Sequence, residues 1–215
     1  MEEMKEFFTS RVDEYDEHML NLVEGCRQAY KEMAGLVPKS CKKLLDLGCG
    51  TGLELEEIFK LLPDLEVTGI DLTDAMLEKL SEKFPDKNIN LICGSYFDED
   101  LGQNKYDCAV SFQTMHHFSK EKKSGLYKRI WDSLKSGGTY IECDYMIENQ
   151  DEEDFYFSEI ARIRKEEGLS EDEFYHYDTP CTIQNQIKLF EKAGFSNIQK
   201  VFRVENTTII TAKKK

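Results

Sequence analysis

The sequence predicts an α/β fold with a doubly wound, mostly parallel sheet. Short apolar runs alternate with amphipathic helical stretches throughout residues 43–145, and this alternation calls for crossover connections that cover both faces of a sheet. A glycine-rich turn, in "LLDLGCGTG" at 44–52, directly follows the first apolar run. The 215 residues suffice for one domain with small additions. We therefore expect a ligand site at the carboxyl ends of the strands.

Five strands are expected in the central part of the chain, because each apolar run is short and ends at a turn signal. They span residues 43–47, 65–72, 89–95, 106–112 and 139–146. The stretches between them include helices with apolar residues at spacings of three and four, which stop at Pro63, at Pro85 and before Gly137. Thr73 is the expected N-cap of the second of these helices.

An N-terminal helical arm, residues 1–40, precedes the alternating region. Its apolar side chains recur at spacings of three and four from residue 3 to about 34, and Gly35 and Pro38 end the pattern. The arm is acidic and amphipathic, unlike the basic and then apolar layout of a secretory signal. We expect the arm to fold over the carboxyl edge of the sheet, and we expect a cytoplasmic protein.

A helical lid insert, residues 149–178, follows the fifth strand. It is acidic and aromatic, and its pattern predicts helices at about 151–167 and 171–177, the second with a capping box. A hydrophobic substrate pocket and a small satellite core explain its aromatic residues equally well. The α/β domain itself comprises residues 41–148 and 179–215, and it closes with a helix and a hairpin.

Charge and composition exclude several classes of partner. The formal net charge of −14 argues against nucleic acid, whose binding relies on Lys and Arg, and no apolar stretch approaches the roughly 20 residues that cross a membrane. The seven cysteines include no Cys-x-x-Cys pair, as expected of reduced, buried thiols. His116 and His117 are adjacent, and we expect their side chains to face different ways. We therefore expect no metal site.

A glycine turn after a first strand can bind a phosphate group, the pyrophosphate of a dinucleotide, or a cofactor without phosphate. A phosphate-binding loop is excluded, because the sequence contains no G-x-x-x-x-G-K-[ST]. A dinucleotide requires G-x-G-x-x-G and an acidic residue about 20 positions later; Asp71 meets the second condition, but Leu53 stands in place of the third glycine. Asp46 and Glu54 flank the glycines and would repel a pyrophosphate. They favour a cofactor that carries ammonium and sulfonium charges.

The motifs "LLDLGCGTG", "GIDLTDAML", "YDCAVSFQTMHHF" and "LKSGGTYIECD" occur in this order. Over residues 10–212 the sequence resembles the class I S-adenosylmethionine-dependent methyltransferases. "RVDEYDEHM" and "MHHF" resemble the small-molecule branch related to ubiquinone-biosynthesis and carboxy-S-adenosylmethionine enzymes. The resemblance implies a seven-stranded sheet of order 3-2-1-4-5-7-6 with the last strand antiparallel. It also implies S-adenosyl-L-methionine as cofactor and S-adenosyl-L-homocysteine as product.

The resemblance further implies a cofactor site, residue by residue. Asp46 would face the methionine ammonium, Gly48 and Gly50 would lie against the methionine portion, and Asp71 would bind the ribose hydroxyls. The remaining implied cofactor residues are Leu72 and Met76 at the adenine, Ser95 and Tyr96 at the adenine edge, Gln113 near the methionine carboxylate or the sulfonium, and Tyr15 of the arm as a cover.

His116 and His117 are the candidate catalytic residues, because imidazole titrates near neutral pH and these two follow the fourth strand. Packing or helix-start roles are the alternative for both. We expect methyl transfer to a small-molecule acceptor, which requires mainly positioning and exclusion of water. The alternatives are an enzyme that uses the cofactor without methylating, such as a carboxy-S-adenosylmethionine synthase, a non-catalytic binding module, and an NAD-dependent oxidoreductase. The acceptor atom and the choice between monomer and homodimer stay open.

Overall fold

The computed structural model describes residues 1–170 and 173–215. Its strands are β1 (Lys43–Leu47), β2 (Glu66–Asp71), β3 (Ile89–Cys93), β4 (Tyr106–Phe112), β5 (Leu134–Tyr145), β6 (Ser196–Val204) and β7 (Thr207–Lys213). Its helices are α1 (Met4–Arg11), α2 (Tyr15–Asn21), α3 (Cys26–Leu36), α4 (Leu53–Leu61), α5 (Asp74–Lys83), the short 3₁₀ helix η1 (Met115–His117), α6 (Lys120–Ser133), α7 (Gln150–Glu167) and α8 (Ile183–Ala193).

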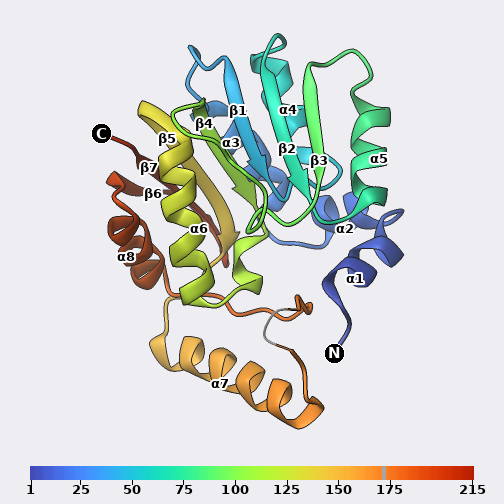
Figure 1. Cartoon of the computed structure of the whole chain (residues 1–215), viewed down its shortest axis with the longest axis vertical. Coiled ribbons are helices and arrows are strands. Elements are labelled where there is room, and N and C mark those ends of the chain that lie inside the picture. Colours follow the sequence, from blue (N-terminus) through green and yellow to red (C-terminus); the bar gives the residue numbers. More distant parts are fainter. Residues whose placement is uncertain (171–172) are drawn as a thin grey trace.

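The strands form one seven-stranded sheet of order β3-β2-β1-β4-β5-β7-β6 (Figure 1). Neighbouring strands run parallel from β3 to β5, whereas β7 is antiparallel to both β5 and β6. The predicted α/β fold, its strand order and its antiparallel last strand are therefore confirmed. Strand order reverses between β1 and β4, so their carboxyl ends form a crevice of the kind that binds ligands in such sheets.

Helices cover both faces of the sheet and bury its apolar side chains. Side chains of α3, α4 and α5 form one cluster against the sheet, and side chains of α6 and α8 form a second cluster on the other face. Because both faces are covered, β1 has no polar face: Leu44, Leu45 and Leu47 are all fully buried. The one charged side chain in its interior, Asp46, is also fully buried.

The N-terminal arm consists of three helices and not of the one continuous helix that the apolar pattern predicts. Its second break falls at Gly25, whose φ is +81° and whose added Cβ would lie 2.8 Å from Val204 Cβ. A glycine is needed there because the arm passes close to the β6–β7 hairpin. The first break turns α2 toward the glycine turn, where Asp16 accepts hydrogen bonds from Thr51 and Lys83.

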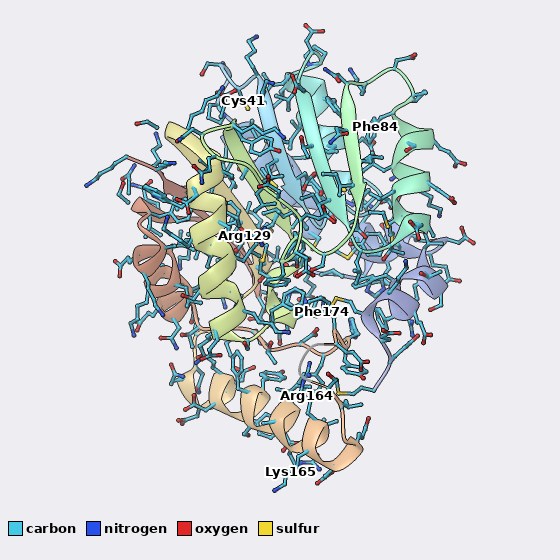
Figure 2. The ribbon with its side chains drawn as sticks, in the orientation of Figure 1. Cys41, Phe84, Arg129, Arg164, Lys165 and Phe174 are labelled. Atoms are coloured by element: carbon cyan, nitrogen blue, oxygen red, sulfur yellow. The ribbon has the colours of Figure 1, made fainter. Side chains whose placement is uncertain are left out.

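The lid insert contains the first of its two predicted helices, α7. The second, predicted at about residues 171–177, is not a helix in the part of that range that the structure describes. Residues 171–172 lie outside the described part of the chain, and residues 173–177 are not helical. Tyr175 instead forms an antiparallel bridge with Glu3, because tertiary pairing overrides the local helix signal. Figure 2 shows Arg164 on the side of α7 that faces this segment, and Lys165 on the outer side. Among the described residues, no helix is long and apolar enough to cross a membrane.

Candidate active site

A cleft opens at the carboxyl ends of the parallel strands, beside the glycine turn. It is open to solvent, and the space within and at the mouth of the cleft amounts to about 600 Å³. The predicted cofactor residues that line it are Tyr15, Gly48, Gly50, Asp71, Leu72, Met76, Ser95, Tyr96 and Gln113. Asp46 does not line the cleft but lies buried beneath the turn. The structure thus brings together residues that the sequence separates by almost a hundred positions.

The glycine turn places bare backbone against the cleft. Gly48 has a φ of +71°, and a Cβ there would lie 2.7 Å from Thr114 Oγ1, so only glycine lets the end of β1 approach the end of β4. Gly50 also has a positive φ, of +47°. An added Cβ there would meet only the ring of Tyr15, at 3.8 Å, which leaves room for a ligand between the turn and the arm.

Asp71 ends β2 and links it to the glycine turn. Its Oδ2 accepts a hydrogen bond from the Gly50 N–H at 2.9 Å, and its Oδ1 accepts one from the Thr73 N–H at 2.9 Å. Burial raises the pKa of the Asp71 carboxyl, and these two N–H groups oppose that rise without cancelling it. Each carboxylate oxygen has a second lone pair, so Asp71 can also accept two hydrogen bonds from a diol in the cleft.

Asp46 and Glu54 form a buried pair of acidic side chains beneath the turn. Both carboxyl oxygens of Asp46 and Oε1 of Glu54 are buried without a hydrogen-bond partner among the described residues. Burial and the neighbouring Glu54 raise the pKa of Asp46 well above its usual range, and burial raises the pKa of Glu54 to about 7. Two carboxyl groups held together without a cation favour the binding of a positively charged group beside them.

A second, larger cavity adjoins the cleft; it is open to solvent, and the space within and at its mouth amounts to about 1710 Å³. Phe8, Tyr15 and Gln113 line both cavities. Gln113, which follows β4, has an unusual positive φ of +50°, and its Nε2 donates a hydrogen bond to Thr207 Oγ1 at 3.3 Å. The predicted catalytic residues, His116 and His117, line the second cavity and not the cleft.

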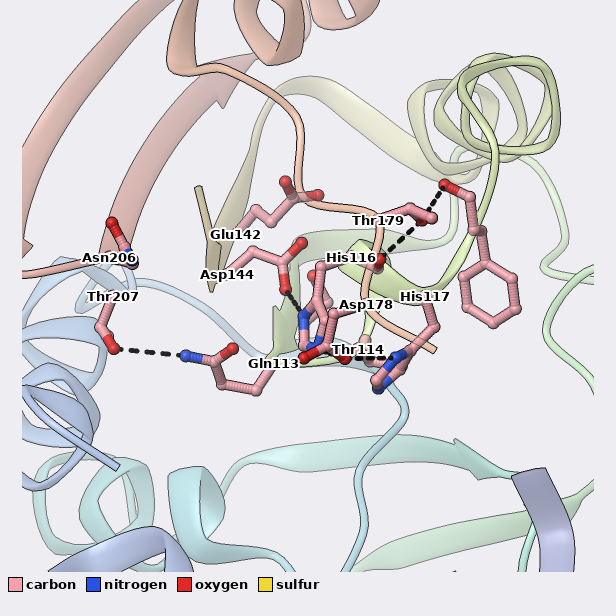
Figure 3. Close-up of polar contacts among 12 residues, drawn as sticks. Gln113, Thr114, His116, His117, Glu142, Asp144, Asp178, Thr179, Asn206 and Thr207 are labelled. Carbon is pink, nitrogen blue, oxygen red and sulfur yellow. Dashed lines mark hydrogen bonds and ion pairs between the residues drawn. The ribbon is translucent and has the colours of Figure 1, made fainter. Parts of the chain in front are cut away.

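His116 lies between two carboxylates (Figure 3). Its Nδ1 is 2.7 Å from Asp144 Oδ1, and its Nε2 is 3.5 Å from Asp178 Oδ1. The same Asp178 oxygen lies 3.3 Å from Nδ1 of His117. The expectation that the two histidines face different ways is wrong: the tight 3₁₀ turn of η1 holds their ring centroids 4.0 Å apart, and both rings face Asp178.

We call His116, His117, Asp144 and Asp178 the histidine cluster. The side chains of the cluster shift one another's pKa values. Burial lowers the pKa of His116, but Asp144 and Asp178 raise it by more, so it lies above its ordinary value. Burial and the neighbouring His116 lower the pKa of His117. Burial acts to raise the pKa of Asp178, but both histidines hold it well below its usual range. Asp178 is therefore ionised at neutral pH.

Sequence reasoning missed both carboxylates of the cluster. Asp144 stands at the carboxyl end of β5, where an acidic residue in an apolar strand is a signal that could have found it. Asp178 has no local signal, because a distant contact places it: the N–H and Oγ1 of Thr179 both donate hydrogen bonds to the His116 carbonyl, at 2.6 and 2.8 Å. These bonds fix the end of the insert against η1.

Some of the aromatic residues of the insert that follow α7 line a cavity, whereas those of α7 itself do not. Phe174 lines the cleft and packs against Phe97 and Phe118, with ring centroids 5.6 and 5.4 Å apart. His176 lines the second cavity. No residue of α7 lines either cavity, and its Phe155 is exposed. The segment after α7, and not the helix, therefore covers the two cavities.

Several known proteins are similar to this chain in sequence or in fold. A family described as "Methyltransferase domain" matches residues 44–138. The chain is 30% identical to a carboxy-S-adenosyl-L-methionine synthase of Nautilia profundicola, over 80% of this chain and 77% of that enzyme. It is 33% identical to a malonyl-[acyl-carrier protein] O-methyltransferase of Acetivibrio thermocellus, over 50% of this chain and 37% of that enzyme. A putative O-methyltransferase structure from Nostoc punctiforme has the same fold, with a TM-score of 0.72 and 22% identity over 96% of this chain and 60% of its own.

Proposed function

This chain belongs to the class I S-adenosylmethionine-dependent methyltransferase family, and we propose that it methylates a small-molecule acceptor and releases S-adenosylhomocysteine. The observation that carries the proposal is the pair of adjoining cavities, which share Phe8, Tyr15 and Gln113 as a common wall. A cofactor in the cleft and an acceptor in the larger cavity would meet at this wall. Methyl transfer requires two ligands in contact and little more from the protein than their positioning.

The cleft fits S-adenosylmethionine through its polar groups. Asp71 has free lone pairs for the two ribose hydroxyls, and Gly48 and Gly50 line the cleft where the methionine portion would lie. The unpartnered carboxyl groups of Asp46 and Glu54 favour a ligand with a positive charge over a pyrophosphate. When bound, the cofactor supplies an electrophilic methyl group on a sulfonium.

The remaining cleft residues would hold the adenine and cover the cofactor. Met76 is buried and Leu72 is partly exposed beside it, so these two provide an apolar wall. The hydroxyl of Tyr96 is 2.9 Å from Thr114 Oγ1, and Ser95 accepts a hydrogen bond from the Phe97 N–H at 3.2 Å. These bonds fix the loop after β3 as the opposite wall.

The histidine cluster would act on the acceptor. The carboxylate of Asp144 holds Nδ1 of His116, so Nε2 is the nitrogen that can take a proton from a hydroxyl, thiol or ammonium acceptor. His117 would orient the acceptor beside it. No nucleophilic side chain is required, because the sulfonium is already a good leaving group, and the arm and the insert would limit access of water.

Synthesis of a carboxylated cofactor is the second candidate function, because the chain resembles carboxy-S-adenosyl-L-methionine synthases. That reaction requires an anionic carboxyl group beside the sulfonium, and cationic side chains stabilise such a group. Among the described residues that line the second cavity, Arg11 carries the one fixed positive charge, and it pairs with Glu2 at 3.3 Å. Four carboxylates line the same cavity: Glu14, Glu24, Asp178 and Glu205. This balance of charge favours methyl transfer to a neutral or cationic acceptor.

Mass spectrometry of the products distinguishes these functions. The protein is incubated with S-adenosylmethionine and a panel of alcohols, phenols, thiols and amines. A methylated acceptor together with S-adenosylhomocysteine supports the proposal, whereas a carboxylated cofactor supports the second candidate. Binding of S-adenosylhomocysteine without turnover of any acceptor contradicts both and indicates a non-catalytic module. The same assay with Asp71→Ala identifies product that a contaminating enzyme makes.

A further inference from the structure

We propose that His116, His117 and Asp178 bind a divalent first-row transition-metal ion, with zinc as the probe of choice, in the larger cavity. Each residue offers one ligand atom, and the three atoms lie within 4.8 Å of one another. The site does not depend on methyl transfer, although it would add a Lewis acid to the proposed function. It reverses the expectation from the sequence that no metal is bound.

Two of the three separations between ligand atoms suit a tetrahedral ion. Asp178 Oδ1 is 3.5 Å from Nε2 of His116 and 3.3 Å from Nδ1 of His117. Ligand atoms at about 2.0–2.2 Å from a tetrahedral zinc are roughly 3.3–3.6 Å from one another. The two imidazole nitrogens lie within 4.8 Å of each other, and an ion shared by all three residues would bring these nitrogens into the same range.

The surroundings of His116 are those of a metal ligand. Asp144 accepts the Nδ1–H of His116 at 2.7 Å, which leaves the lone pair on Nε2, the nitrogen nearest Asp178. A carboxylate on the far nitrogen of a metal-binding histidine fixes its tautomer and raises its basicity. The backbone bonds from Thr179 to the His116 carbonyl hold Asp178 in place. Both ligand-bearing segments are thus positioned before any ion binds.

Asp178 is paired with the two histidines at 3.3 and 3.5 Å, longer than ordinary hydrogen bonds. Its Oδ1 is a buried atom without a hydrogen bond among the described residues, although the side chain as a whole is partly exposed. A buried carboxylate oxygen without a hydrogen bond is costly, and a cation shared with two neutral imidazoles would stabilise it. Two nitrogens and one oxygen without a thiolate suit zinc, iron(II), cobalt(II) or manganese(II) more than copper(I).

The charged groups around the cluster favour a cation. Glu14, Glu24 and Glu205 line the same cavity, and Arg11 is occupied by Glu2. His176 lies beside the cluster, with its ring centroid 4.9 Å from that of His117. Since the cluster faces the cavity, an acceptor hydroxyl or thiol could occupy a further coordination position. The ion would lower the pKa of that group, and His116 would then act as a ligand and not as a base.

Metal titration of the untagged, chelator-treated protein tests the proposal. Calorimetry with Zn²⁺ should give one equivalent of saturable binding, and Co²⁺ should give the visible absorption bands of a four- or five-coordinate ion. His117→Ala and Asp178→Asn should each weaken Zn²⁺ binding by at least tenfold, and Asp144→Asn by about tenfold. His18→Ala is the matched control, because His18 is an exposed histidine of the same cavity that lies outside the cluster.

Two results would overturn the proposal: the absence of saturable Zn²⁺ binding, and binding that Asp178→Asn leaves unchanged. Affinity for S-adenosylhomocysteine, measured on every variant, shows whether the variant is folded. If His117→Ala fails to fold, Asp178→Asn still decides the question. Failure of the proposed function is a separate result, because a protein that binds Zn²⁺ but methylates no acceptor contradicts only that function.

Discussion

Asp144 Oδ1 and His116 Nδ1 lie 2.7 Å apart at the end of β5 and the start of η1. The bond joins the carboxyl end of β5 to the wall of the larger cavity, and it fixes the orientation of His116, which has carboxylates on both sides. Because Asp144 and His116 both lie outside the lining of the cleft, the pair can be altered without touching the residues proposed to hold the cofactor.

Asp144→Asn should slow turnover by about 10–100-fold while it leaves affinity for S-adenosylhomocysteine within twofold. The amide keeps the size of the side chain but loses the charge that holds the His116 tautomer. Steady-state kinetics at saturating cofactor and calorimetry with S-adenosylhomocysteine provide the two readouts. A variant that binds the cofactor poorly but turns over normally once saturated would assign the pair a structural role instead.

The pH dependence of turnover should distinguish a base from a metal ligand at His116. In the chelator-treated enzyme, neutral His116 is the active form, so activity should be lost as pH falls through a pKa that the carboxylates hold above the ordinary histidine value. Added Zn²⁺ should move the inflection to lower pH, because imidazole that binds metal no longer titrates. His116→Gln should flatten the profile of the metal-free enzyme. An identical inflection in His116→Gln would assign it to another group.

Asp71→Ala should weaken S-adenosylhomocysteine binding by at least 100-fold, since it removes the acceptors proposed for the ribose hydroxyls and frees the Gly50 and Thr73 N–H groups. Asp71→Asn keeps one acceptor oxygen and should lose less. Asp64→Ala, on the exposed loop before β2, is the control. Unchanged affinity by calorimetry in a folded Asp71→Ala variant would remove Asp71 from the site.

Glu54→Gln should stabilise the ligand-free protein more at pH 8 than at pH 5.5. Burial raises the pKa of Glu54 from 4.5 to about 7, so between these two pKa values the folded carboxyl stays protonated while the unfolded one ionises. Stability is therefore lost as the pH rises from about 4.5 to about 7, by up to about 3 kcal/mol, and the whole loss is present at pH 8. Gln stays neutral throughout, which thermal unfolding at the two pH values will detect. Equal melting temperatures of the two proteins at pH 8 would contradict this assignment.

Much of the lining of the cleft could be predicted because its signals are local. The glycines of the first turn and Asp71 at the end of β2 follow directly from apolar runs and turn residues, and strand order followed from family resemblance. Of the histidine cluster, only the two histidines could be predicted. Its histidines are adjacent in the sequence, but Asp178 reaches them through the bonds of Thr179 to η1, a contact between distant segments that no spacing in the sequence encodes.

The same limit explains the two errors in secondary structure. The apolar spacing over residues 3–34 continues across Gly25, where the β6–β7 hairpin imposes a break from the far end of the chain. The capping box at Ser170 is a valid local signal, yet residues 173–177 pair with the N-terminal segment instead. In both places tertiary contacts override the local helix propensity.

The bridge between Glu3 and Tyr175 also bears on the order of folding. It joins segments at nearly opposite ends of the chain, and the Met4 N–H and His176 N–H extend it with bonds to Phe174 and Glu2. Contacts of such long sequence separation close the largest loops and form late. Met4 and Phe174 line the cleft and His176 lines the larger cavity, so the cover over both cavities is expected to assemble after the parallel strands beneath it have paired.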